Sequence, residues 1–155
     1  MEIYFSYGQF LVFDSSVELP GLDWTDAHSK QGFARRGRNV AFATILNHGT
    51  ARVRLFFSSF EPSDSYERVI EVPIFLPSGD VVVGGTEEFD DINRVIVEAG
   101  HYRLTCAQSR DGEQGESIDL FFERTRDPIT TSRIIHADSE IDVPSTLLEI
   151  AETAE

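Results

Sequence analysis

The sequence predicts an all-β fold, a single-domain antiparallel β-sandwich or barrel, on the basis of three observations. Short apolar stretches alternate with a period of two residues, turn residues separate them, and no long stretch has the 3.6-residue period of a helix. A chain of 155 residues can bury one core without a disulfide or a metal ion. We expect about seven to nine short strands over residues 1–126, followed by an acidic C-terminal extension over 127–155.

The first expected strand begins near the N-terminus. Ile3, Phe5 and Tyr7 lie on one face of an extended segment, and Phe10 and Val12 continue the alternation. This pattern is typical of a strand with one buried face. We therefore expect that face to lie against the core.

A short helical turn is expected next, around the only tryptophan, Trp24. Thr25 and Asp26 are of the residue types that cap a helix, and Gly32 is of the type that ends one. The turn would bury Trp24 and Phe33 and close one end of the β-structure.

Two later stretches have the pattern of a β-hairpin. In residues 39–60, two alternating segments flank the turn residues 47–50. Residues 92–106 repeat this arrangement around a turn at 98–100. We predict that the two strands of each stretch pair with each other.

Three further strands complete the expected β-structure, and one of them is the short valine run 81–83, which ends at Gly84 and Gly85. The strand at 70–74 contains Pro73, which lacks a backbone donor, so this strand is expected at a sheet edge or a bulge. The last firm strand places Ile118, Leu120 and Phe122 on its inner face.

The C-terminal extension differs in character from the rest of the chain. Thr146 and Glu149 have the spacing of a capping box, which predicts a short C-terminal helix over 146–150. No lysine or arginine follows Arg133. The extension is therefore acidic, and we expect it to be loosely held.

The chain carries a formal net charge of −14, from 27 acidic and 13 basic residues. Residues 79–155 hold 18 of the acidic and 6 of the basic residues, a net charge of −12, whereas residues 1–78 are nearly balanced. A nucleic-acid binder attracts phosphates with lysine and arginine, so this charge argues against direct binding to DNA or RNA. It is compatible with plain solubility and with docking on a basic protein.

No motif in the sequence points to an enzyme or to a cofactor. The four histidines lack the spacings of a zinc site, and nucleotide-binding glycine patterns and hydrolase motifs are absent. Cys106 alternates with Leu104 in an expected strand and is interpreted as a core residue. The single cysteine and the lack of a secretion signal predict a reducing, cytoplasmic setting. No stretch reaches the ~20 apolar residues needed for membrane insertion.

Two acidic loops are the candidate partner-binding sites. Their residues are Glu87, Glu88, Phe89, Asp90 and Asp91 in the first loop, and Asp111, Glu113 and Glu116 in the second. These carboxylates can face a basic protein, with Phe89 as a central anchor. One alternative is a β-sandwich without enzymatic activity that binds calcium or another small ligand through the same loops. A less favoured alternative is a hydrolase whose histidines gather in space.

Four blocks of sequence also resemble one protein family. In chain order they are residues 5–13, the motif Asp23, Trp24, Thr25 and Asp26, residues 65–67 with 72–73, and residues 100–106. Together they are similar to the competence protein J family, whose members look like inhibitors of a DNA-entry nuclease. The resemblance implies a cognate DNA nuclease as the partner, no cofactor, and a role in DNA uptake or as an immunity protein. It assigns no inhibitory residue. We interpret Trp24 and Asp26 as fold-defining first, with a surface role open for Asp23 or Asp26.

Overall fold

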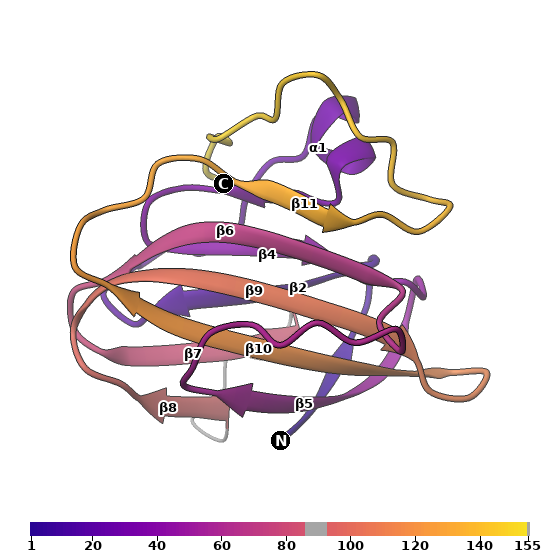
Figure 1. The fold of residues 1–155 in the computed structure, drawn as a ribbon, viewed down its shortest axis with the longest axis horizontal. Helices are drawn as coiled ribbons and strands as arrows, with labels where there is room; N and C mark the ends of the chain where they lie inside the picture. Colours follow the sequence, from indigo (N-terminus) through magenta and orange to yellow (C-terminus); the bar gives the residue numbers. More distant parts are fainter. Residues whose placement is uncertain (86–92, 155) are drawn as a thin grey trace.

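The computed structural model describes residues 1–85 and 93–154, which form two facing β-sheets (Figure 1). The first sheet has the spatial order β1 (Glu2–Phe5), β5 (Gly49–Phe56), β10 (Gly115–Thr125), β9 (Gly100–Arg110), β6 (Arg68–Leu76) and β11 (Arg133–His136). The second has the order β3 (Phe33–Arg35), β4 (Asn39–Ala43), β2 (Gln9–Asp14), β7 (Asp80–Gly85) and β8 (Arg94–Ile96). Neither sheet closes on itself. The all-β prediction is therefore confirmed as a sandwich, with eleven strands in the described ranges.

The core fills the space between the two sheets. The first sheet contributes the fully buried Leu104 and Leu120, and the second contributes Phe10 and Phe42, whose ring centroids lie 5.5 Å apart. Cys106 is buried in the same cluster, as its alternation with Leu104 predicts. Removing these side chains from water supplies the main driving force for folding.

Both predicted hairpins are wrong, because their strands lie in different sheets or pair with other strands. β4 belongs to the second sheet, whereas β5 belongs to the first, where it pairs antiparallel with β1 and parallel with β10. β8 pairs with β7, and β9 pairs with β6 and β10. A two-residue period identifies the face of a strand that is buried, but it does not identify the neighbour of that strand.

The N-terminal alternation is likewise divided between the sheets. Ile3 and Phe5 face the core from β1, and Phe10 and Val12 face it from β2. Tyr7 lies in the turn between these strands, has a φ of 59° and is 74% exposed. The expectation that Tyr7 shares the buried face is therefore wrong, since the strand ends before it.

Pro73 lies where the first sheet has a free edge. β11 pairs with β6 only as far as Glu71, so Pro73 has a strand neighbour, β9, on one side. A residue without a backbone N–H costs no ladder hydrogen bond there. The edge position predicted for the strand as a whole is wrong, because β11 lies beyond it, and it holds only at Pro73 itself.

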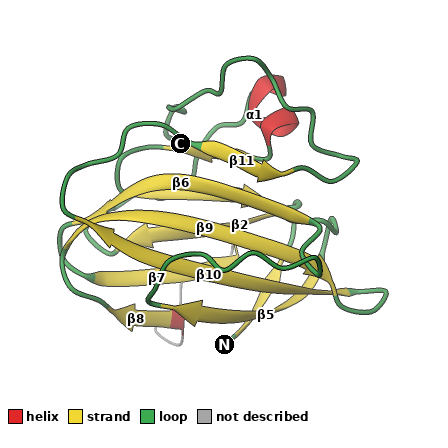
Figure 2. Ribbon diagram, viewed as in Figure 1, coloured by secondary structure: helices red, strands yellow, loops and turns green. Residues whose placement is uncertain are grey.

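The short helical turn forms where the sequence predicts it, as α1 (Asp26–Gln31), shown in Figure 2. Thr25 is the N-cap, and it forms a reciprocal capping box with His28. Gly32 ends the helix in the left-handed conformation, with a φ of 86°. Phe33 is fully buried, whereas Trp24 is half-buried. At six residues, α1 is too short to cross a membrane, and no other α-helix occurs in the described ranges.

The predicted C-terminal helix is wrong: residues 141–154, here called the C-terminal strap, form no helix and are bonded to α1 and β3. Gln31 binds both backbone groups of Leu148, at 2.8 and 3.0 Å. The Glu149 carboxylate accepts hydrogen bonds from Ser132 and pairs with Arg35 at 3.7 Å, so it cannot serve a capping box. These bonds replace the internal hydrogen bonds of a helix.

The strap continues as an added edge beside the second sheet. The Ala151 N–H donates to the Arg35 carbonyl at 2.9 Å, and Leu22 forms an isolated antiparallel bridge with Thr153. The Ile141 side chain lies over Gly32. The strap is therefore held by many backbone contacts, and the expectation that it is loosely held is wrong. The division into 1–126 and 127–155 stays a prediction.

Candidate functional site: the hairpin end of the sandwich

Several loops gather at one end of the sandwich, here called the hairpin end after the β9–β10 hairpin that projects from it (Figure 1). The loops are residues 6–8, 44–48, 61–67, 111–114 and 137–140. Backbone bonds join neighbouring loops: the Gly8 N–H donates to the Asn47 carbonyl at 2.7 Å, and the Thr44 N–H donates to the Gly8 carbonyl at 2.9 Å. Loops held by a rigid sheet are common carriers of binding function.

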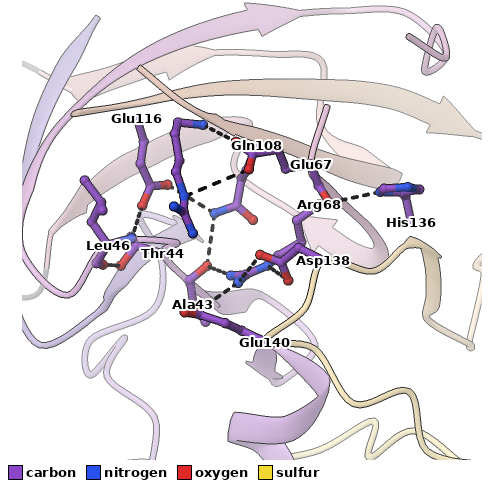
Figure 3. A network of polar contacts seen from close by, with 11 residues as sticks. Ala43, Thr44, Leu46, Glu67, Arg68, Gln108, Glu116, His136, Asp138 and Glu140 are labelled. Carbon is purple, nitrogen blue, oxygen red and sulfur yellow. Dashed lines mark hydrogen bonds and ion pairs between the residues drawn. The ribbon is translucent and has the colours of Figure 1, made fainter. Parts of the chain in front are cut away.

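A buried polar network lies beneath these loops, as Figure 3 shows. Glu116, which is 1% exposed, accepts a hydrogen bond from the Leu46 N–H at 2.6 Å. Gln108 is fully buried, and its amide nitrogen donates to the Ala43 carbonyl at 3.0 Å and lies 3.5 Å from Glu116 Oε2. The strands β9 and β10 thereby fix the path of the 44–48 loop.

Arg68 is the cation at the centre of this network and is 1% exposed. Its Nε and Nη2 bind the two oxygens of Asp138 at 3.1 and 2.9 Å, and its Nη1 donates to the Ala43 carbonyl at 3.0 Å. Glu140 lies 3.5 Å from the same guanidinium (Figure 3). A two-point contact of this kind fixes orientation as well as distance, so β6 anchors the 137–140 loop.

Glu67 joins two more segments to the hairpin end. Its Oε2 accepts from the Arg110 N–H at 2.6 Å, and its carbonyl accepts from His136 Nδ1 at 2.9 Å. Its own N–H donates to the Gln108 carbonyl at 2.8 Å. The hairpin and the end of β11 are therefore tied to the same frame.

The three central polar residues share a pattern that the sequence contains but that the sequence analysis missed. Arg68 lies two residues before Ile70, Gln108 two after Cys106, and Glu116 two before Ile118. Each continues the inward-facing register of its strand by one step. A polar residue that lies two positions beyond the last inward-facing apolar residue of a strand predicts such a buried network.

The structure separates the predicted partner-binding residues into three groups. Asp111 and Glu113 are exposed on the β9–β10 turn, as a docking role requires. Glu116 is buried, so its assignment to the partner surface is wrong: its carboxylate is used by the Leu46 N–H and Gln108. Residues 87–91 lie outside the described residues, and their role stays a prediction.

The family-like motif has a structural role in two of its four residues. Thr25 caps α1. The Trp24 Nε1–H donates to Gln9 Oε1 at 2.9 Å, and Trp24 packs against the buried cluster that includes Leu11 and Phe13. The carboxylates of the motif, Asp23 and Asp26, are exposed, and neither forms an ion pair with a described residue.

No three histidine, cysteine, aspartate or glutamate side chains in the described ranges converge to hold a metal ion. Glu116 points into the interior and does not join Asp111 and Glu113, so the second loop cannot supply three carboxylates to calcium. Burial raises the pKa of Cys106 well above its ordinary value, which disfavours the thiolate that a nucleophile needs. The calcium alternative, which also used residues 87–91, stays a prediction.

Burial raises the pKa of Glu116 above its ordinary value, against the opposing effects of its hydrogen bonds and of Arg68. The folded chain therefore keeps this proton at a pH where the unfolded chain has released it. Above the pKa of Glu116 in the folded chain, the buried carboxylate reduces stability. As the pH falls from that pKa toward the ordinary value of 4.5, this loss of stability disappears, because the folded chain binds the proton before the unfolded chain does.

We expect Glu116→Gln to raise the free energy of unfolding at pH 7 by about 1–2 kcal/mol. The amide keeps an acceptor for the Leu46 N–H and removes the buried negative charge, and it gives up the long 3.5 Å contact between Gln108 Nε2 and Glu116 Oε2. Urea unfolding at pH 7 and pH 5 measures the effect, which should shrink at the lower pH. The exposed Glu113→Gln is the control. A less stable Glu116→Gln protein at pH 7 would contradict this account.

The hairpin end and its sandwich match a known family. The sequence profile described as Competence protein J (ComJ) matches residues 2–123. The chain belongs to the competence protein J family. A curated relative from Bacillus subtilis (strain 168), described as "DNA-entry nuclease inhibitor", is 30% identical over 110 residues, which cover 68% of this chain and 77% of the relative.

A solved structure shares the competence protein J fold. It is the crystal structure of ComJ from Bacillus subtilis, described as the inhibitor of the DNA degrading activity of NucA. The two chains are 23% identical with a TM-score of 0.67, over 81% of this chain and 94% of that chain. The family resemblance in the sequence is thus confirmed. The C-terminal strap lies beyond the residues that the family profile matches.

Proposed function

We propose that this chain is a protein inhibitor of a DNA-degrading nuclease and that it acts by binding its cognate nuclease, without an enzymatic reaction or a cofactor. The observation that carries the proposal is membership of the competence protein J family, with a relative described as a DNA-entry nuclease inhibitor. Binding and blocking a nuclease would serve either of two roles: control of DNA degradation during uptake, or protection of the cell by an immunity protein.

Charge gives the proposal a physical mechanism. A nuclease attracts DNA with a positive groove, and a protein with a net charge of −14 is attracted to the same groove. Carboxylates can then replace phosphates and exclude the substrate. Asp64 and Glu113 at the hairpin end are exposed and form no ion pair with a described residue, so they are free to meet a basic partner.

Rigidity supports the same mechanism. The loops of the hairpin end are fixed by Arg68, Gln108 and Glu116 before any partner binds. Loops that are already ordered lose little conformational entropy on association, which favours tight binding. The buried, unpaired Cys106 needs no oxidising environment, and we propose a cytoplasmic location for the chain.

The test is DNA cleavage by the nuclease encoded next to this protein, with and without one equivalent of the purified chain. We expect cleavage to stop and a one-to-one complex to elute from a size-exclusion column. Association should slow as salt rises from 50 to 500 mM, because screening weakens the attraction between opposite charges. Full cleavage with no complex would contradict the proposed function.

A further inference from the structure

We propose that the hollow between Tyr7 and Trp24 is a receptor pocket for an arginine side chain of the nuclease. The inference rests on the proposed function and names the part of the surface that binds. The hollow has a volume of about 280 Å³ and is lined by Tyr7, Gly8, Gln9, Trp24, Ser29 and Ala43. It lies beside the hairpin end and receives residues from β2, β4, α1 and the 6–8 turn.

The walls of the hollow are fixed by bonds within the chain. Trp24 is oriented by its hydrogen bond to Gln9 and by the apolar cluster beneath it. The turn that carries Tyr7 is held on both sides of Gly8, by the Asn47 carbonyl and by the Thr44 N–H. A pocket with such walls exists before the partner arrives.

Tyr7 has a conformation that fold stability alone does not favour. Its φ of 59° lies in the left-handed region, which glycine and asparagine adopt more readily than tyrosine. Tyr7 is 74% exposed as a residue, and its hydroxyl has no hydrogen-bond partner in the described part of the chain. A ring kept in this position gains little from the fold, and tyrosine is among the residues that dominate binding interfaces.

Exposed carboxylates close to Trp24 in the chain favour a basic occupant. Asp23 and Asp26 flank Trp24 in sequence and are exposed. Ser29, which lines the hollow, lies three residues after Asp26, so both residues occupy one face of α1. Residues 22–31 hold these two aspartates and Lys30, so their net charge is −1 (−2 + 1).

An arginine matches this arrangement better than other side chains. Its guanidinium can stack on aromatic faces while it binds a carboxylate with two hydrogen bonds, whereas a lysine ammonium is a strongly hydrated point charge. Arginine is also abundant where a protein contacts DNA phosphates, so the DNA-binding face of a nuclease can supply it. Occupying that arginine would remove a phosphate contact from the enzyme.

The decisive variant is Tyr7→Gly, which removes the ring and relieves the left-handed backbone. We expect a melting temperature equal to or above that of the wild type, together with nuclease binding that is about 10- to 100-fold weaker by isothermal titration. Tyr7→Asn, which also tolerates this backbone, should give the same result. Tyr4→Ala is the matched control, since Tyr4 is 49% exposed on β1 and does not line the hollow. It should change the affinity less than threefold.

A direct probe tests the occupant without the nuclease. Titration of N-acetylarginine amide into the labelled full chain should shift the Trp24 indole N–H resonance more than N-acetyllysine amide does, and Asp26→Asn should reduce the shift. If Tyr7→Gly inhibits the nuclease as strongly as the wild type does, the proposed arginine pocket is wrong, while the proposed function still stands. No inhibition by the wild type would overturn the proposed function, whatever the variant does. Equal responses to both amides would overturn the choice of arginine.

Discussion

Arg68→Leu is expected to lower the free energy of unfolding by about 3–5 kcal/mol, because the change leaves buried groups without their cation. Asp138 loses a two-point contact at 2.9 and 3.1 Å, and the Ala43 carbonyl loses a donor. The nearby Glu116 also loses a favourable charge that opposes the effect of burial on its pKa. Urea unfolding followed by tryptophan fluorescence measures the loss as a lower midpoint.

Arg52→Leu is the matched control for this change. Arg52 is 73% exposed, and its guanidinium lies 3.9 Å from Asp111. An exposed pair of this kind contributes little to stability, so the control should change the free energy of unfolding by less than about 1 kcal/mol. The double variant Arg68→Leu with Asp138→Leu should recover part of the loss, because it removes both charges together. Equal stabilities for the two single arginine variants would contradict the role given to Arg68.

Local features of this fold could be predicted from local sequence. Thr25 and Gly32 delimit α1 because a hydroxyl cap and a left-handed glycine act within one turn of the chain. The inward faces of the strands were also predictable, since alternation alone decides which side chains avoid water. These features depend on residues that are neighbours in sequence.

Strand partners could not be predicted in the same way. β4 and β5 follow each other in sequence and look like a hairpin, yet the 44–48 loop carries the chain from one sheet to the other. The bonds that hold this crossing come from residues far away in sequence, from Gly8 and from Glu116, which accepts from the Leu46 N–H. The same holds for the strap, where Thr146 and Glu149 have a capping-box spacing but Ser132 and Arg35 bind the Glu149 carboxylate.

The residues of the candidate site also divide into those that local sequence predicts and those that depend on distant parts of the chain. The exposure of Asp111 and Glu113 was predictable from a polar turn. The burial of Glu116 could be found only by extending the inward-facing alternation of Ile118 back by two residues, into a stretch whose polar composition is that of a turn. The hollow beside Tyr7 combines a turn between β1 and β2 with the segment before α1. Two sequence blocks that look unrelated along the chain therefore meet at one surface.

Gln31→Leu is expected to lower the free energy of unfolding by about 2–4 kcal/mol, because one buried side chain holds the strap at two points and binds β3 at a third. Gln31 is buried, donates to the Phe33 and Leu148 carbonyls at 2.9 and 3.0 Å, and accepts from the Leu148 N–H at 2.8 Å. Leucine keeps the volume but leaves those backbone groups without a partner. Urea unfolding measures the loss, with the exposed Gln114→Leu as the control.

Hydrogen exchange separates release of the strap from general loosening in the same variant. In Gln31→Leu, the amides of Leu148 and Ala151 should exchange faster than in the wild type by a larger factor than core amides such as that of Leu120, because opening the strap needs only local unfolding. The α1 helix should loosen with the strap, since His28 accepts from the Thr25 N–H through Nδ1 and donates to the Ile150 carbonyl through Nε2. Uniform acceleration across strap and core would show that the strap and the sandwich unfold as one unit, and protection equal to the wild type would show that Gln31 does not hold the strap.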